Sequence, residues 1–223
     1  MCIRDRLGRL PRLGTQVDSD LQALSQRHGH EVAGLRTTRA LPALAAAVQA
    51  DLLAAEDLSR YDYVLLTDDD VVMPDGFLDA FIGLQEKLGF AIAQPARTSN
   101  SYIDHPIVEQ ANGLLARETR FVEIGPVVSF HRSAYDVVFP FDLASPMGWG
   151  YENVWSLRLG ERGLKMGILD ATPVDHSIRK PVENYDWSTA DRQRTDFLDR
   201  NAHLPIDSCF TTVQAIRLEG EPG

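Results

Sequence analysis

The sequence predicts an α/β layer fold whose central sheet is mostly parallel. Its middle part alternates strand-like runs with helix-like segments, which is the pattern of this fold class. Residues 61–67 (YDYVLLT) are rich in β-branched and aromatic types and predict a strand buried on both faces. The composition, 44% apolar and 24% charged over 223 residues, is that of an ordinary globular chain. We therefore expect one main domain with a hydrophobic core large enough to be stable without disulfides or structural metals.

The first half of the chain gives the clearest element signals. Asp18 or Ser19 can cap a helix over 21–27, and residues 31–35 predict a short strand. The Ala- and Leu-rich residues 41–56 predict a helix. Pro74 fits the first turn of another helix, because the N–H that proline lacks has no partner there. The apolar positions of that helix follow helical spacing: Phe77, Leu78, Phe81, Ile82 and Leu88.

The second half is less regular. Residues 90–94 predict a strand that Pro95 ends, whereas the polar residues 96–118 receive no assignment. The other predicted elements are strands over 120–124 and 126–130 on either side of Gly125, a helix over 133–138, a loop over 140–150, a helix over 152–161 that Gly163 ends in the left-handed conformation, a strand over 166–169, and a polar, partly helical segment over 182–202.

The charge excludes several classes of partner. The 22 basic and 32 acidic side chains give a net charge of −10, which argues against nucleic acid and anionic membrane surfaces as partners.

No stretch reaches the roughly 18–20 apolar residues of a membrane span, and the first residues lack the apolar part of a signal peptide. We therefore expect a cytoplasmic protein without a membrane span. Two cysteines, Cys2 and Cys209, make neither a disulfide framework nor a zinc knuckle.

Three aspartates, Asp68, Asp69 and Asp70, directly follow the strand over 61–67. Side chains alternate along a strand, so Asp68 and Asp70 can face the same side at the end where open α/β sheets bind ligands. Paired carboxylates repel each other, and a hard divalent cation such as Mn²⁺ or Mg²⁺ removes that conflict. The alternative is a solvent-exposed acidic turn before a helix.

A second motif surrounds Trp149. Gly148 and Gly150 allow a tight turn, while Trp149, Tyr151 and Trp155 offer flat apolar faces suited to sugar rings. Glu152 stands beside them as a candidate proton acceptor. The alternative is an ordinary helix start with core tryptophans. His176, after the strand over 166–169, could complete a mixed nitrogen and oxygen metal site, although a lone histidine is more often structural.

In this order and spacing, the three features resemble a family 2-like GT-A glycosyltransferase. YDYVLLTDDD resembles the strand and DxD motif of that fold, and GWGYEN resembles the acceptor motif of β-1,4-galactosyltransferases and polypeptide N-acetylgalactosaminyltransferases. LKMGILDATPVDH resembles the strand and closing metal histidine of both groups. The resemblance implies a Rossmann-like three-layer sandwich. It also implies transfer of a sugar from a nucleotide diphosphate sugar, uridine-linked in these groups, to a carbohydrate or other hydroxyl acceptor.

The resemblance also implies roles for single residues. Asp70, Asp68 and His176 would bind the metal, and Glu152 would act as the base. Asp68 would also contact the substrates. The other candidates for contact with the donor or the acceptor are Asp69, Arg39, Gln94, Trp149, Gly150 and Tyr151. The galactosyltransferases have a second acid where this chain has Asn153, so the motif leaves the stereochemical outcome open.

The beginning of the chain departs from the GT-A pattern. Residues 1–6 (MCIRDR) resemble a translated sequencing adaptor, and nothing in residues 7–16 resembles the opening nucleotide-binding strand. We therefore expect an N-terminally truncated domain over 7–180, with a partly helical tail over 181–223 that packs on it. Two other functions stay open: metal-dependent phosphoryl or nucleotidyl transfer, and sugar or nucleotide binding without catalysis.

Overall fold

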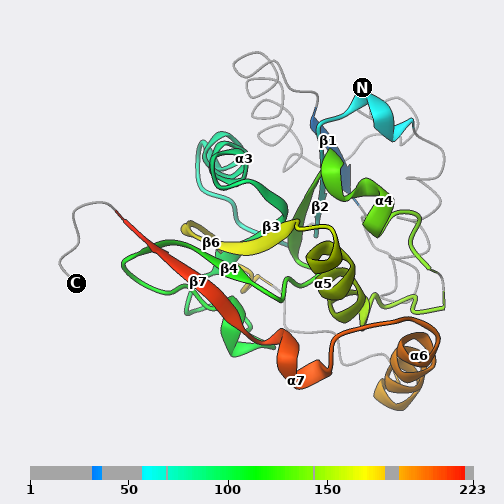
Figure 1. The fold of residues 1–223 in the computed structure, drawn as a ribbon. Helices are drawn as coiled ribbons and strands as arrows, with labels where there is room; N and C mark the ends of the chain where they lie inside the picture. The colour runs from blue at the N-terminus through cyan, green and yellow to red at the C-terminus, as the bar shows by residue number, and fades with distance from the viewer. Residues whose placement is uncertain (1–31, 37–56, 69, 143, 179–185, 219–223) are drawn as a thin grey trace, which may run out of the picture.

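A computed structural model describes residues 32–36, 57–68, 70–142, 144–178 and 186–218 (Figure 1). The helices predicted over 21–27 and 41–56 lie outside these residues. Within them, one sheet has the strand order β1-β2-β5-β3-β6-β4-β7. The strands are β1 Val32–Arg36, β2 Tyr63–Thr67, β3 Phe90–Arg97, β4 Leu114–Thr119, β5 Val127–His131, β6 Lys165–Val174 and β7 Thr212–Arg217.

The sheet is mixed, which corrects the prediction of a mostly parallel sheet. Among the described strands, the β1–β2 and β3–β6 pairings are parallel, and the other four of the six pairings are antiparallel. The reason is that β5 enters between β2 and β3, and β4 lies between β6 and β7, each running against its neighbours. Nevertheless β2, β3 and β6 all run in the same direction, so their carboxyl ends lie at one edge of the sheet.

Helices cover both faces of the sheet, which gives the α/β layers that the alternating pattern predicts (Figure 1). Tyr63 and Leu65 of β2 pack on the side of α3, whereas Val64 and Leu66 pack on the side of α5. This alternation explains why the whole of β2 is buried. The helices are α3 Phe77–Leu88, α4 Tyr135–Val138, α5 Tyr151–Glu161, α6 Trp187–Arg200 and α7 Ile206–Cys209, with 3₁₀ turns η2 Leu58–Arg60, η3 Pro106–Val108 and η4 Arg132–Ala134.

Several local predictions are wrong in instructive ways. Pro74 lies before α3 rather than in its first turn, and Gly76 caps the helix with a φ of 70°. β3 continues through Pro95 to Arg97, because its ladder with β5 extends only as far as Ala93, so no ladder hydrogen bond to β5 needs the N–H that Pro95 lacks. Residues 120–124 form no strand, and β4 lies instead at the end of the unassigned residues 96–118 and continues to Thr119.

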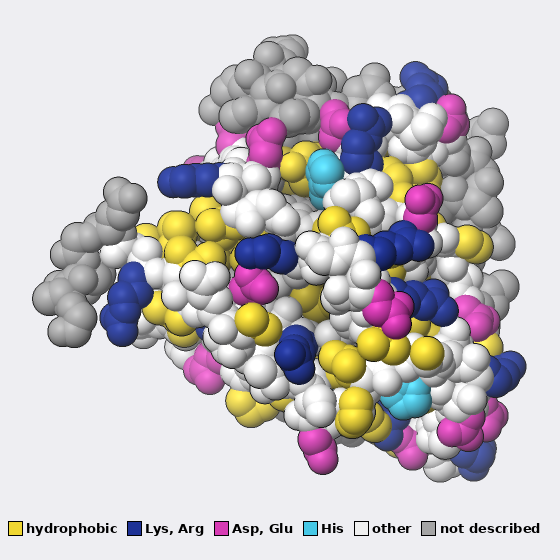
Figure 2. Space-filling model, viewed as in Figure 1, with side chains coloured by type: hydrophobic (Ala, Val, Ile, Leu, Met, Phe, Trp, Pro, Cys, Tyr) yellow, Lys and Arg dark blue, Asp and Glu magenta, His cyan; other side chains and the backbone are white. Residues whose placement is uncertain are grey.

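The surface of the described residues carries both signs of charge. Acidic and basic side chains are interspersed over the face drawn in Figure 2 rather than gathered into blocks of one sign. Among the helices of the described part, none has the length and the apolar character needed to cross a bilayer. The C-terminal segment supplies α6, α7 and β7, and β7 pairs with β4 at the end of the sheet.

Candidate functional site

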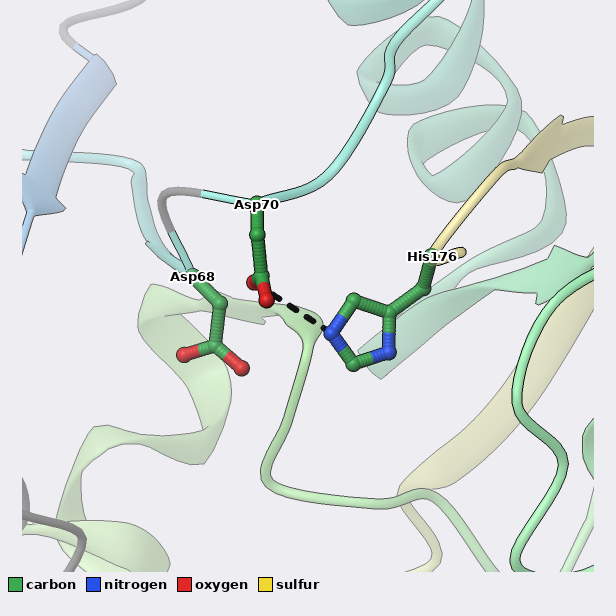
Figure 3. Close-up of side chains that lie close together, drawn as sticks. All are labelled: Asp68, Asp70 and His176. Atoms are coloured by element: carbon green, nitrogen blue, oxygen red, sulfur yellow. Dashed lines mark ion pairs between the residues drawn. The ribbon is translucent and has the colours of Figure 1, made fainter. Parts of the chain in front are cut away.

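Asp68, Asp70 and His176 come together at the carboxyl edge of the sheet (Figure 3). One ligand atom from each residue lies within 4.8 Å of the others, and His176 Nε2 is 3.3 Å from Asp70 Oδ1. Asp68 is exposed, while Asp70 and His176 are partly buried, so solvent reaches the group from one side. We call these three residues the acidic triad. Two carboxylates and one imidazole are a donor set that fits Mn²⁺ or Mg²⁺.

A short backbone bridge holds the two sides of the acidic triad in place. Val72 N–H donates to Asp175 O at 2.8 Å, and Asp175 N–H donates to Val72 O at 3.1 Å. Asp70 and His176 lie next to this bridge on their respective segments, one after β2 and the other after β6. The geometry therefore depends on two segments far apart in sequence that pair at the edge where their strands end.

The loop after β3 fixes the backbone of His176. His176 N–H donates to Ser101 Oγ at 2.9 Å, and Thr98 N–H donates to Val174 O at 3.0 Å. Metal-binding histidines usually donate their second ring N–H to an acceptor. His176 Nδ1 is buried and has no hydrogen-bond partner within the described part of the chain. The imidazole thus keeps its Nε2 side toward the aspartates while its other nitrogen is unsatisfied.

Glu152 lies in the first turn of α5, in a separate environment. Gly150 caps this helix with a φ of 93°, a left-handed conformation that favours glycine, and its N–H donates to Glu152 Oε1 at 3.2 Å. Burial raises the pKa of Glu152 to about 7, while hydrogen bonds from the backbone oppose this change. A carboxyl group with this pKa exchanges protons near neutrality, which suits a general base.

Residues Glu123, Ile124 and Gly125, which we call the linking segment, lie between the acidic triad and the surroundings of Glu152. A methyl group on Gly125 would stand 3.5 Å from Asp68 Oδ2. A methyl group on Gly148, in the loop before α5, would stand 2.9 Å from the Ile124 side chain. Glu123 itself raises the pKa of Glu152 through its charge. The linking segment therefore joins two motifs that the sequence keeps apart.

The remaining predicted site residues have different surroundings. Trp149 is partly exposed, with its ring centroid 5.0 Å from that of Trp187. Tyr151 and Trp155 belong to the core, where their rings stack on each other, so neither offers the open ring face that we expected. The Gln94 side chain is buried and accepts the N–H of Glu123. Asp69 and Arg39 lie outside the described residues.

Three residues that the sequence motifs do not include interact with one another, and the charges of two of them, Glu123 and His105, act on Glu152. Glu123 accepts a hydrogen bond from Arg97 and lies 2.5 Å from His105 Nδ1 through its Oε1 atom. Arg97 is buried and also donates to Gly125 O at 3.2 Å and Tyr102 O at 2.8 Å. Glu123, Arg97 and His105 come from three separate segments. A charged side chain at the end of the apolar β3, Arg97, is the one signal in the sequence that could have drawn attention to them.

Comparisons with known proteins establish no family for this chain. No family model matches it. Over 55 residues it is 49% identical to a bifunctional glutamine synthetase adenylyltransferase/adenylyl-removing enzyme of Streptomyces coelicolor, a match that covers 24% of this chain and 6% of that protein. A structure described as mannose-1-phosphate geranyltransferase from Thermus thermophilus aligns with 72% of this chain and 65% of its own, at 12% identity and a TM-score of 0.32. The chain thus spans less than two thirds of either protein.

Proposed function

We propose that this chain is a metal-dependent glycosyltransferase that moves a sugar from a nucleotide diphosphate sugar to a hydroxyl acceptor. The observation that carries the proposal is the acidic triad, whose ligand atoms lie within 4.8 Å of one another although Asp70 and His176 follow different strands. The same three residues are the ones for which the resemblance to GT-A enzymes implies a metal. A divalent cation bound there would neutralise the negative charge that develops on the departing diphosphate.

Different residues of the chain would contact the metal, the sugar donor and the acceptor. Asp68, Asp70 and His176 hold the cation, and Asp69, Arg39 and Gln94 are the candidates for donor contacts. Trp149 offers its partly exposed ring to the acceptor, and Gly150, which is buried next to it, orients the start of α5. The uridine-linked donor rests on the resemblance of the YDYVLLTDDD and GWGYEN motifs to GT-A enzymes.

Glu152 is the proposed proton acceptor. Its pKa of about 7 means that near neutral pH a substantial fraction is ionised and can take a proton. As the acceptor oxygen bonds to the anomeric carbon, the bond from that carbon to the diphosphate oxygen breaks, and the acceptor proton moves to Glu152. A general base of this kind contributes about 10²–10⁴-fold to the rate.

The experiment is a screen of nucleotide sugars with and without MnCl₂, with the products identified by mass spectrometry. We expect a nucleoside diphosphate and a glycosylated acceptor, formed only with the metal. Asp70→Asn and His176→Ala should lose Mn²⁺ binding measured by electron paramagnetic resonance, and with it the transfer. Glu152→Gln should keep Mn²⁺ binding and lose about 10²–10⁴-fold in rate.

Asp75→Asn is the matched control, because it removes one exposed carboxylate a few residues after Asp70 that does not belong to the acidic triad. This variant should bind Mn²⁺ and turn over like the parent. Release of pyrophosphate or inorganic phosphate would identify nucleotidyl or phosphoryl transfer instead, for which the same triad could serve. Donor binding without any product would identify a sugar- or nucleotide-binding domain.

A further inference from the structure

Two tryptophan side chains, Trp149 and Trp187, meet at the surface near the start of α5. Their ring centroids are 5.0 Å apart and their planes are inclined by 47°, so the two rings form a corner. Trp187 is 61% exposed, the largest fraction among the large apolar side chains of the described residues, and Trp149 is partly exposed. Trp155, in contrast, is 2% exposed and belongs to the core. We call Trp149 and Trp187 the tryptophan pair.

The loop before α5 holds the backbone of Trp149. Ser145 Oγ donates to Trp149 O at 2.7 Å, and Gly148 N–H donates to Ser145 O at 2.8 Å. Ser145 is itself buried, so water does not compete for these bonds. The exposed ring of Trp149 is therefore attached to a fixed backbone.

Helix α6 holds Trp187, its first residue, beside the same loop. Farther along α6, the ring of Phe197 meets that of Tyr151 edge-on, with a centroid distance of 5.0 Å. A methyl group on Gly150 would stand 3.2 Å from the Leu198 side chain, which shows how closely α6 approaches the start of α5. The contact between the two tryptophans thus lies between elements that pack against each other.

Polar and charged groups adjoin Trp187 along the chain. Asp186 caps α6, and the hydroxyl groups of Ser188 and Thr189 donate to its carboxylate at 2.7 and 2.6 Å. Arg192 donates to Thr189 Oγ1 at 2.9 Å. A pyranose ring has C–H groups on its faces and hydroxyl groups around its edge, so it matches aromatic faces that are bordered by groups of this kind.

The linking segment connects the loop that carries Trp149 to the acidic triad. Ile124 packs against Gly148, the neighbour of Trp149, and Gly125 packs near Asp68 Oδ2. One short segment therefore separates this loop from the proposed metal site, where the nucleotide diphosphate of the donor would be held.

We propose that the tryptophan pair is the binding site of a carbohydrate acceptor, and that Trp187 supplies the ring face that selects a pyranose over other compounds with hydroxyl groups. Trp187 lies outside the GWGYEN motif and comes from the C-terminal segment of the chain. The proposal rests on the proposed function for the use of the bound sugar as acceptor, whereas the binding itself requires only the two rings.

Binding can be measured without a donor or a metal. The test is a titration of the full chain with cellobiose and with N,N′-diacetylchitobiose, followed through the indole N–H signals in ¹H–¹⁵N NMR spectra. The chain has three tryptophans, and Trp149→Phe and Trp187→Phe assign their signals. With at least one disaccharide, we expect the Trp149 and Trp187 signals to shift and the Trp155 signal to stay in place. Glycerol, which has hydroxyl groups but no ring face, should shift none of them.

Two substitutions separate the flat ring of Trp187 from its apolar volume. Trp187→Leu keeps an apolar side chain without a flat face, whereas Trp187→Phe keeps a ring. We expect the dissociation constant, followed on the Trp149 signal, to rise about 5–10-fold in Trp187→Leu and to stay within about 3-fold of the parent value in Trp187→Phe. An unchanged Trp155 signal in both variants shows that the core is intact.

Phe210→Leu is the matched control, because it removes the ring of another exposed aromatic residue. This variant should bind the disaccharide like the parent. The proposal is overturned if neither disaccharide shifts the signals of the tryptophan pair, if glycerol shifts them equally, or if Trp187→Leu binds as tightly as the parent.

The outcomes also separate this proposal from the proposed function. If the disaccharide binds as expected and no sugar transfer is found, the tryptophan pair is a sugar-binding site and the proposed function fails. If transfer is found and Trp187→Leu leaves the KM for the acceptor unchanged, the function stands and the acceptor binds elsewhere. In the expected case, Trp187→Leu raises that KM about 5–10-fold and leaves Mn²⁺ binding unchanged.

Discussion

At the scale of single residues, the burial of Glu152 opposes folding once the pH is high enough to ionise its carboxyl group. Its pKa of about 7 lies above the ordinary 4.5 because burial disfavours the charged form. The folded chain therefore binds more protons at this site than the unfolded chain between pH 4.5 and about 7. Stability contributed by the neutral carboxyl is present below this window and is lost as the pH rises through it.

Glu152→Gln should remove this loss, because the amide stays neutral at every pH. We expect the variant to be more stable than the parent by about 1–3 kcal/mol at pH 8 and to differ little near pH 4. Urea unfolding at the two pH values measures the difference. Glu161→Gln, an exposed position at the other end of α5, is the control and should change stability by less than about 0.5 kcal/mol at both. A Glu152 variant equally stable relative to the parent at both pH values would contradict the explanation.

The site residues divide into those that local sequence could predict and those that it could not. Asp68 and Asp70 directly follow a recognisable strand, and His176 closely follows another, so position along the chain was informative. Glu123 and His105 have no such signal, and Arg97 has only its charge at the end of the apolar β3, because their contacts depend on three segments that meet only in the folded chain. Tyr151 shows the converse limit, since its motif resembles a ligand-binding one while its ring lies in the core.

At the scale of elements, a buried ion pair joins β4 to β6. Arg117 Nε and Nη2 donate to the two Asp170 oxygens at 2.9 and 2.8 Å, and Ala111 N–H donates to Asp170 Oδ1 at 2.8 Å. Asp170→Ala should cost about 3–5 kcal/mol in urea unfolding, because it leaves a guanidinium without its counter-ion in the interior.

The same two strands supply the control for this prediction. Lys165 of β6 and Glu118 of β4 form an ion pair at 2.9 Å, but the lysine side chain is 50% exposed. Glu118→Gln should therefore change stability by less than about 1 kcal/mol. Similar losses in both variants would mean that burial does not distinguish the two pairs.

Element prediction succeeded where hydrophobic spacing was strong and failed where pairing decided the outcome. Helix α5 and strand β2 begin within two residues of their predicted starts, and α3 contains the predicted apolar positions although it begins three residues after Pro74. In contrast, β4 carries charged side chains, Arg117 and Glu118, whose partners are supplied by other segments. Its strand signal is weak because its burial depends on β6 and β7, which come much later in the chain.

At the scale of the whole molecule, the wrong prediction of a mostly parallel sheet did not affect the expectation that Asp68, Asp70 and His176 meet at its carboxyl edge. The sheet is mixed rather than mostly parallel, yet β2, β3 and β6 run together and end at the same edge. The sequence pattern could indicate alternating layers, but it could not show that β5 and β4 enter against their neighbours. The position of a site in an α/β sheet depends on where the relevant strands end, not on the direction of every neighbour.

This arrangement predicts that metal binding stabilises the entire fold. The acidic triad joins the segment after β2 to the segment after β6, so a cation bound there favours the folded chain, in which its ligands are already close together. At a Mn²⁺ concentration about 100 times its dissociation constant, we expect a gain of about 2.7 kcal/mol, which raises Tm by about 5–10 °C for a chain of this size. Scanning calorimetry with and without MnCl₂ measures the shift. His176→Ala should lose it and Asp75→Asn should keep it; an equal shift in both variants would mean that Mn²⁺ stabilises the fold from another position.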